Sequence, residues 1–150
     1  MAGRLYLIDS NVLIRWVQPE ASEFRVVVRA IRRLEDTGDT PCYTSQNLGE
    51  FWNVLTRPAD RNGYGLPPES ALIRAEKVEA KFRLLADSLE VHEEWRRLLI
   101  LHRVSGVQVH DARLAAAMHV HGVKRILTFN MRDFARFANI EAVHPADFSR

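Results

Sequence analysis

The sequence has little that would link the chain to an oxidising compartment or to a membrane. It contains one cysteine, Cys42, so a disulfide within the chain is excluded and a reducing environment is expected. No apolar run approaches the roughly 20 residues that a membrane-spanning helix needs. Residues 1–4 lead directly into a short apolar run and lack the architecture of a signal peptide. We therefore expect a cytoplasmic protein that is not embedded in a membrane.

Several catalytic signatures are also absent from the sequence. It has no GxGxxG, no P-loop lysine motif and no nucleophile-elbow serine. The pair His92-Glu93 does not open a zinc-protease motif, because Arg96 stands where the second histidine would be. His119 and His121 project from different sides of a helix, and with one cysteine a zinc site is disfavoured. Acidic residues at strand ends remain, and these favour an oxygen-ligated ion such as Mg²⁺ or Mn²⁺.

The composition is that of an ordinary globular protein. Of the 150 residues, 47% are hydrophobic and 27% are charged, and the net charge is only +2. The simplest interpretation is one domain that spans residues 1–150. The basic residues are overwhelmingly arginine, with lysine only at positions 77, 81 and 124. Arginine suits phosphate recognition, but a genome-wide codon bias gives the same excess, and the two interpretations carry equal weight.

Apolar runs and helical stripes alternate along the chain in the order β-α-α-β-α-α-β-α-α-β-α-β. This alternation predicts an α/β sandwich around a mostly parallel sheet. The expected strands are residues 5–8, 41–44, 84–86, 125–129 and 140–143. Proline and glycine predict a loop over residues 56–68, and a second loop is expected over residues 103–110, before a helix at 112–121.

The stretch Leu5–Ile8 followed by Asp9 organises the rest of the sequence. The apolar run suits a central strand that is buried on both faces. Asp9 then lies at the carboxyl end of that strand, where open α/β sheets place their ligands. The alternative is that Asp9 caps the next helix, but Ser10 or Asn11 can supply a cap as well. A site is therefore somewhat favoured over a cap.

Three further carboxylates are candidates for the same edge. Asp111 shares one helical face with apolar residues, so it continues a buried stripe, although it could also cap the helix. Glu50 lies opposite the apolar stripe of its helix, so periodicity alone predicts that it is exposed to solvent. Asp133 follows a strand end and could cap a helix or line the same edge as Asp9.

Four segments, in order, resemble the PIN-domain family and in particular the VapC-type toxins of bacterial toxin–antitoxin pairs. Each motif is weak alone, but the ordered set spans nearly the whole chain. The segments are 7–13 (LIDSNVL), 50–66 (EFWNVLTRP, then NGYGL), 105–114 (SGVQVHDARL) and 127–134 (LTFNMRDF).

The resemblance implies a PIN-like three-layer α/β/α sandwich and a Mg²⁺- or Mn²⁺-dependent endoribonuclease. The three near-invariant acids of the family fall on Asp9, Glu50 and Asp111, which would turn Glu50 toward the cleft. Many members have a fourth aspartate where this chain has Asn130, so the fourth position is filled either by Asp133 or by Asn130 as a neutral oxygen donor. The supporting residues implied by the resemblance are the hydroxyl side chains Ser10 and Thr128.

The resemblance also implies partners. The family usually forms homodimers and is inhibited by a small antitoxin protein, and the segment 56–82 is a plausible contact element. Arg57, Arg113 and Arg132 are candidate contacts to RNA phosphates because they lie near the motifs. Two alternatives stay open: a PIN-fold RNA-binding module with weak or lost catalysis, which the departure at Asn130 keeps possible, and a metal-dependent phosphohydrolase acting on another substrate, such as DNA or small molecules.

Overall fold

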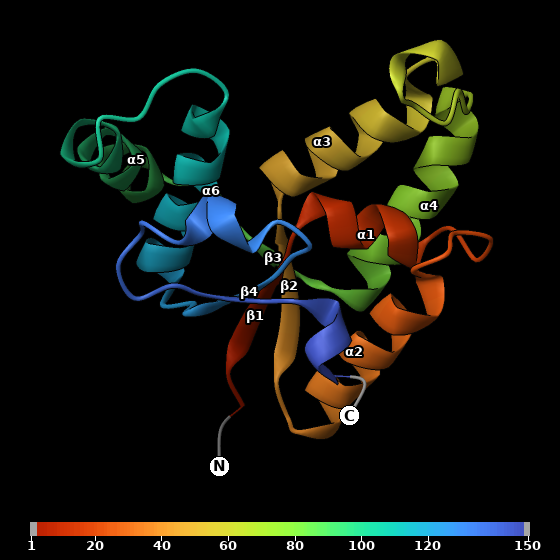
Figure 1. Ribbon diagram of the computed structural model, residues 1–150, viewed down its shortest axis with the longest axis horizontal. Coiled ribbons are helices and arrows are strands. Elements are labelled where there is room, and N and C mark those ends of the chain that lie inside the picture. Colours follow the sequence, from red (N-terminus) through yellow and green to blue (C-terminus); the bar gives the residue numbers. More distant parts are fainter. Residues whose placement is uncertain (1–2, 149–150) are drawn as a thin grey trace.

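The computed structural model describes residues 3–148 and contains a parallel sheet between two layers of helices (Figure 1). The sheet order is β3-β2-β1-β4-β5, and every neighbouring pair is parallel. The strands are β1 (Leu5–Ile8), β2 (Thr40–Thr44), β3 (Arg83–Leu85), β4 (Arg125–Leu127) and β5 (Glu141–Val143). The predicted parallel α/β sandwich is therefore confirmed.

Helices cover both faces of this sheet. On one face, α1, α2, α3 and α4 share a core cluster with Tyr6 and Ile8, and on the other α5 and α6 pack around Leu7. Alternate residues of β1 thus enter different cores, as the continuous apolar run predicts. The helices are α1 (Ser10–Trp16), α2 (Phe24–Asp36), α3 (Ser45–Thr56), α4 (Pro68–Lys81), α5 (Leu89–Leu101) and α6 (Gln108–His121), and the 3-10 turns are η1 (Ala59–Arg61), η2 (Met131–Phe134) and η3 (Pro145–Phe148).

The central strand β1 marks the point at which the strand order reverses. The chain moves from β1 to β2 on one side, and later places β4 on the other side. Leu7 therefore pairs with Cys42 of β2 and with Ile126 of β4. In open parallel sheets a crevice forms outside the carboxyl ends of the strands at such a point, and ligands bind there. The topology thus directs attention to the residues that follow β1 and β4.

Two helix starts differ from the sequence-based expectation. The N-cap of α3 is Thr44 rather than Ser45, because the Thr44 hydroxyl accepts from the Asn47 amide at 3.1 Å while Asn47 Oδ1 accepts from the Thr44 amide at 3.0 Å. The expected loop 103–110 is also too long, since α6 begins at Gln108. Trp95 Nε1 donates to the Val109 carbonyl at 2.8 Å and holds this first turn against α5.

Among residues 3–148, no helix is both long enough and apolar enough to cross a membrane.

The buried capping box of α3 generates a stability prediction. Asn47→Ala removes a fully buried amide that satisfies the Thr44 backbone and hydroxyl, so unfolding free energy should fall by about 1–3 kcal/mol. Urea denaturation measures this loss. Asn53→Ala, on the exposed side of the same helix, is the matched control and should change stability by less than about 0.5 kcal/mol. Equal losses in the two variants would contradict the role assigned to the Asn47 amide.

Candidate active site

Asp9 occupies the position that the sequence predicts, directly after β1. Its side chain is 9% exposed, and both carboxylate oxygens accept hydrogen bonds. Oδ1 accepts from the Ser10 amide at 2.8 Å and Oδ2 accepts from Thr128 Oγ1 at 2.8 Å. Asp9 is itself the N-cap of α1, as the capping alternative predicts, and neither Ser10 nor Asn11 takes that position. The second oxygen, however, is oriented by Thr128, which directly follows β4, and capping does not require such a contact.

Thr128 joins the ends of the two central strands. Its fully buried hydroxyl donates to Asp9 and accepts from the Asn130 amide at 3.0 Å. Asn11 Nδ2 donates to the same oxygen at 3.4 Å, and Asn11 Oδ1 accepts from the Phe129 amide at 3.3 Å. Asn11 therefore fastens α1 to the segment after β4. Sequence reasoning assigned Asn11 only a capping role, because nothing in the local pattern identifies a partner 117 residues away.

Glu50 is exposed, as helical periodicity predicts, yet it lies beside the residues that follow β1. Glu50 Oε1 accepts from Ser10 Oγ at 3.4 Å and from Gln46 Nε2 at 3.4 Å. Ser10 is in turn only 7% exposed and accepts from Asn47 Nδ2 at 3.3 Å. The carboxylate thus faces an open hollow next to Asp9, and its large exposure does not place it on the outer surface.

Asp111 and Asp133 approach the same point from two other elements. Asp111 is half-buried in the first turn of α6, four residues beyond the N-cap position, so it does not cap the helix. Burial is the largest of the effects that raise the pKa of Asp111 to about 7; the charges of Asp133, Asp9 and Glu50 contribute in that order, while His110 opposes them. Asp133, which is exposed in η2, therefore lies within electrostatic range of Asp9 and Asp111.

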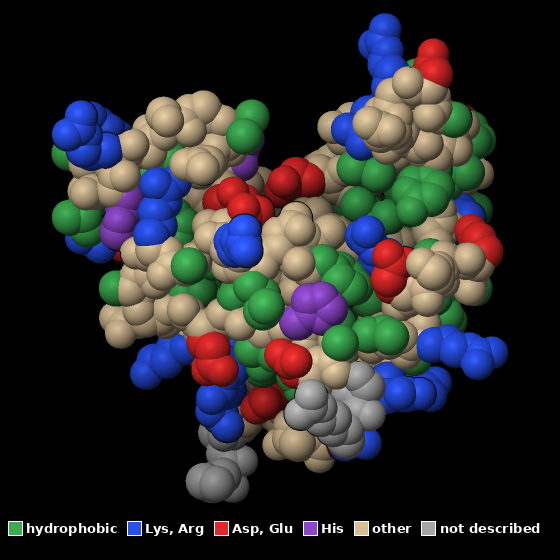
Figure 2. All heavy atoms as spheres, viewed as in Figure 1, with side chains coloured by type: hydrophobic (Ala, Val, Ile, Leu, Met, Phe, Trp, Pro, Cys, Tyr) green, Lys and Arg blue, Asp and Glu red, His purple; other side chains and the backbone are tan. Residues whose placement is uncertain are grey.

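The same coupling is seen from the other acids. Burial raises the pKa of Asp9, hydrogen bonds from Thr128 and the Ser10 amide oppose this, and Asp133 raises it further. Burial and then the charge of Asp9 raise the pKa of Glu50. Figure 2 shows acidic side chains on the floor of a hollow between two lobes, one with α5 and α6 and the other with α3 and α4. The four predicted acids therefore gather at one edge of the sheet.

The donor chemistry of this group suits a divalent cation. Carboxylate oxygens are the ligands that Mg²⁺ and Mn²⁺ prefer, and a cation would relieve the mutual repulsion that the raised pKa values report. As placed, no three His, Cys, Asp or Glu side chains of residues 3–148 stand close enough to hold an ion. The residues thus fit a metal by charge and ligand type, and the side chains are not closed into a ligand shell.

The three candidate arginines behave differently from one another. Arg57 Nη2 donates to the Asn62 carbonyl at 2.8 Å, which holds it against the loop after α3. Arg113 Nη2 lies 3.4 Å from Asp87 Oδ1 and pairs with it. Arg132 is exposed in η2, next to Asp133 in the sequence. Only Arg132 thus combines exposure with a place immediately beside the acids.

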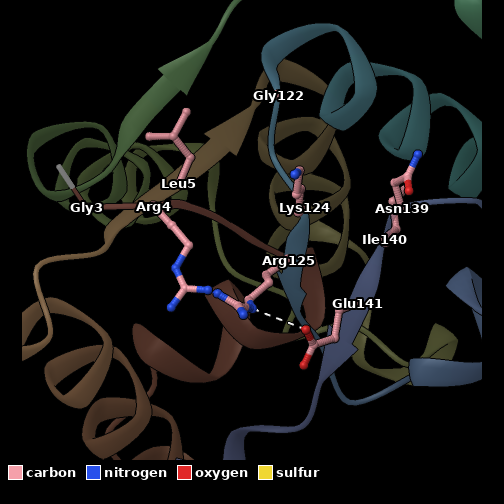
Figure 3. Close-up of a pocket in the computed structure, with 9 residues that line it drawn as sticks. All are labelled: Gly3, Arg4, Leu5, Gly122, Lys124, Arg125, Asn139, Ile140 and Glu141. Atoms are coloured by element: carbon pink, nitrogen blue, oxygen red, sulfur yellow. Dashed lines mark hydrogen bonds and ion pairs between the residues drawn. The ribbon is translucent and has the colours of Figure 1, made fainter. Parts of the chain in front are cut away.

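A cavity of about 620 Å³ lies at the opposite, amino edge of the sheet (Figure 3). Arg4, Lys124 and Arg125 line it, and Arg125 Nε lies 3.2 Å from Glu141 Oε2. It contains none of the four acids. We therefore assign the chemistry to the hollow at the carboxyl edge, because the coupled carboxylates and the reversal of strand order coincide there.

Electrostatic repulsion at this edge predicts a pH dependence. Because the folded-state pKa of Asp111 is raised, the native protein binds more protons than the unfolded chain between about pH 4 and pH 7. In EDTA, the melting temperature should therefore fall as pH rises through this range. Asp111→Asn should reduce that fall and exceed the wild-type melting temperature by roughly 2–4 °C at pH 8. Glu93→Gln, which removes an exposed carboxylate elsewhere, should run parallel to wild type. Parallel curves for all three proteins would contradict the coupling.

Comparisons with known proteins concern the fold as a whole. A chain in the crystal structure of VapBC2 from Rickettsia felis bound to a DNA fragment from its promoter has a TM-score of 0.68 and 13% identity, covering 93% of this chain and 98% of that one. A chain in the structure of DNA-bound VapBC from Salmonella typhimurium has a TM-score of 0.68 and 19% identity, covering 97% of this chain and 99% of that one. VapC20 from Mycobacterium tuberculosis, a Sarcin-Ricin loop cleaving toxin, has a TM-score of 0.63 and 16% identity, covering 90% of this chain and 98% of that one.

At these identities, the structural matches establish the fold. No curated protein sequence matches the chain significantly. The family model for the PIN domain, however, matches residues 6–140, which include all four acids and the strands β1 to β4 except for Leu5. The chain therefore belongs to the PIN-domain family.

Proposed function

We propose that the chain is a divalent-metal-dependent endoribonuclease and the toxin of a toxin–antitoxin pair. The observation that carries this proposal is the electrostatic coupling of Asp9, Glu50, Asp111 and Asp133 at the carboxyl edge of a PIN-domain sheet. Carboxylates are brought together at a stability cost in this way where they hold a catalytic cation. The similarity to VapC20, described as a toxin that cleaves the Sarcin-Ricin loop, favours RNA as the substrate.

The chemistry assigns a role to each part of the site. A bound Mg²⁺ or Mn²⁺ would activate the attacking water and neutralise charge on the leaving oxygen. Asp9, Glu50 and Asp111 would hold the ion. Thr128 orients one oxygen of Asp9 and the Ser10 amide orients the other. The Ser10 hydroxyl links Asp9's helix to Glu50, so the protein positions the carboxylates from three separate elements.

We assign the fourth acidic position to Asp133. Its charge acts on both Asp9 and Asp111. The Asn130 side chain is exposed, and the Asn130 contact with the site network is through its backbone amide to Thr128. A carboxylate three residues further along the chain thus replaces the charge that the family's usual aspartate would supply.

Among the arginines, we assign a phosphate contact to Arg132. It is exposed beside Asp133, where a substrate phosphate at the metal would need a cation. Arg57 and Arg113 are engaged by Asn62 and Asp87, so they are assigned to structure rather than to RNA.

A cognate antitoxin and a second copy of the chain are the proposed protein partners. Several similar structures are of toxin–antitoxin complexes, including VapBC from Salmonella typhimurium. Exposed apolar side chains on α4 and the loop before it, Leu72, Ile73 and Tyr64, provide a surface of the kind that protein partners cover. These residues lie in the segment 56–82 that the sequence marks as a contact element.

Asp9→Asn separates a metal ligand from a simple cap. Asparagine caps a helix about as well as aspartate, so a capping role alone predicts little change. If Asp9 holds the ion, cleavage of RNA in Mn²⁺ should fall by at least about 100-fold. The metal-free variant should be more stable by about 1 kcal/mol because one repulsive charge is gone. Mn²⁺ should raise the melting temperature of wild type by mass action, and of the variant much less.

The assay should present RNA, DNA and a phosphomonoester to wild type, with Mn²⁺ and with EDTA. Cleavage of RNA alone, only with metal, is the expected result. Preference for DNA or the phosphomonoester would favour a different phosphohydrolase, and binding of RNA without cleavage would favour a non-catalytic module. If Mn²⁺ raised the melting temperatures of wild type and Asp9→Asn equally, Asp9 would be excluded as a ligand.

The fourth position is tested by a pair of substitutions. Asp133→Ala removes a charge that couples to Asp9 and Asp111, so metal-supported activity should fall by about tenfold or more. Asn130→Asp restores the family's usual acid and should keep or raise activity. Initial rates across a Mn²⁺ titration measure both. Wild-type activity in Asp133→Ala would remove the assignment.

A further inference from the structure

The side chain of Gln46 reaches from α3 to α6, and the proposed nuclease function gives it no role. It lies in the first turn of α3, one turn before Glu50. Its Nε2 donates to the His110 carbonyl at 2.8 Å and to Glu50 Oε1 at 3.4 Å. His110 immediately precedes Asp111 in α6. One amide group therefore contacts both Glu50 and the backbone that carries Asp111.

The orientation of this amide is determined by its neighbours. Both groups near Nε2 are oxygens that can only accept, so exchanging the amide oxygen and nitrogen would bring oxygen against oxygen twice. The orientation as placed leaves Gln46 Oε1 buried and without a hydrogen-bond partner. Water would satisfy this oxygen if the side chain swung outward. The side chain stays inside because its two Nε2 contacts hold it there, and an unsatisfied acceptor is a cost to stability.

The contact also joins parts of the structure that otherwise touch little. Among the side-chain hydrogen bonds of residues 3–148, the bond from Gln46 to His110 is the one that links α3 to α6. Figure 1 shows α3 and α6 rising on either side of the carboxyl ends of the central strands, and the two helices carry Glu50 and Asp111. The bond therefore ties the start of α3, which carries Glu50, to the first turn of α6, which carries Asp111.

We propose that Gln46 is a positioning residue that sets the distance between Glu50 and Asp111 across the cleft. This inference rests on the proposed nuclease function, which it deepens by naming what aligns the carboxylates of α3 and α6. The buried acceptor is the stability cost of this alignment.

Gln46→Met tests the proposal, because methionine has a similar length and no donor. We expect kcat to fall by about tenfold to 100-fold, as misplacement of reacting groups does, while KM for RNA changes less than about threefold. The Mn²⁺ concentration for half-maximal activity should rise. The melting temperature in EDTA should stay equal or increase, because the buried unpaired oxygen is removed along with the bond.

Gln108→Met is the matched control. Gln108 is an exposed glutamine in the first turn of the same α6, and its Oε1 accepts from Arg136 Nη2 at 2.7 Å. This variant should keep wild-type kcat and Mn²⁺ dependence. An activity loss in Gln46→Met that vanishes once rates are normalised to folded protein would overturn the positioning role, since it would reflect stability alone.

Hydrogen exchange separates this inference from the proposed function. If wild type fails to cleave RNA in Mn²⁺, the proposed function fails, but the link between α3 and α6 can still be measured. Amide exchange over residues 109–112 should be faster in Gln46→Met than in wild type, and unchanged over α2. Unchanged exchange at 109–112 would overturn the inference whatever the activity assay gives.

Discussion

The buried carboxylate of Asp9 is the group on which the rest of the site depends. A carboxylate this deeply buried is costly unless donors or a cation compensate it. The Ser10 amide compensates one oxygen locally, but the other relies on Thr128, 119 residues further along the chain. That bond can form only because β4 lies directly beside β1 in parallel register, with Ile8 opposite Leu127. The strand order and the state of Asp9 are thus linked.

The arrangement places the demands of folding and of chemistry in opposition. Two hydrophobic cores, one on each face of the sheet, hold the strand ends in position. At those ends the chain gathers carboxylates whose pKa values are raised by burial and by one another. Each such group lowers the stability of the metal-free fold, and the cores supply the stability that tolerates it. Under the proposed function, a divalent cation would convert this repulsion into binding free energy, because the mutually repelling carboxylates would become its ligands.

Polar side chains near the acids link the helices that carry them. Asn47 is fully buried, completes the cap of α3 and reaches Ser10, while Gln46 spans the opening to α6. Both lie about one helical turn before Glu50. The start of α3 therefore caps the helix and links it to α1 and to α6. These two amides link α3 to the helix that follows Asp9 and to the helix that carries Asp111.

The sequence by itself determined the alternation of strands and helices, the buried strand 5–8 and the position of Asp9 at its end, because these follow from local periodicity. The ordered motifs led to the family, and the family match over residues 6–140 confirms that identification. Periodicity also predicted the exposure of Glu50 correctly, yet it could not tell an outer surface from the open side of a cleft. That distinction depends on which element lies opposite the helix.

Only the tertiary structure decided which side chains meet. The local pattern around Asn11, Gln46 and Asn47 is compatible with ordinary helix starts, and it gives no sign of Thr128, His110 or Ser10 as partners. Asp9 proved to be both the cap of α1 and the acceptor of a hydrogen bond from Thr128, just after β4, a combination that reasoning on neighbouring residues does not anticipate. The physical reason is that a cap is a contact between residues a few positions apart, which the sequence shows. The pKa of Asp111 depends on Asp9, Glu50 and Asp133, which only the fold brings near it.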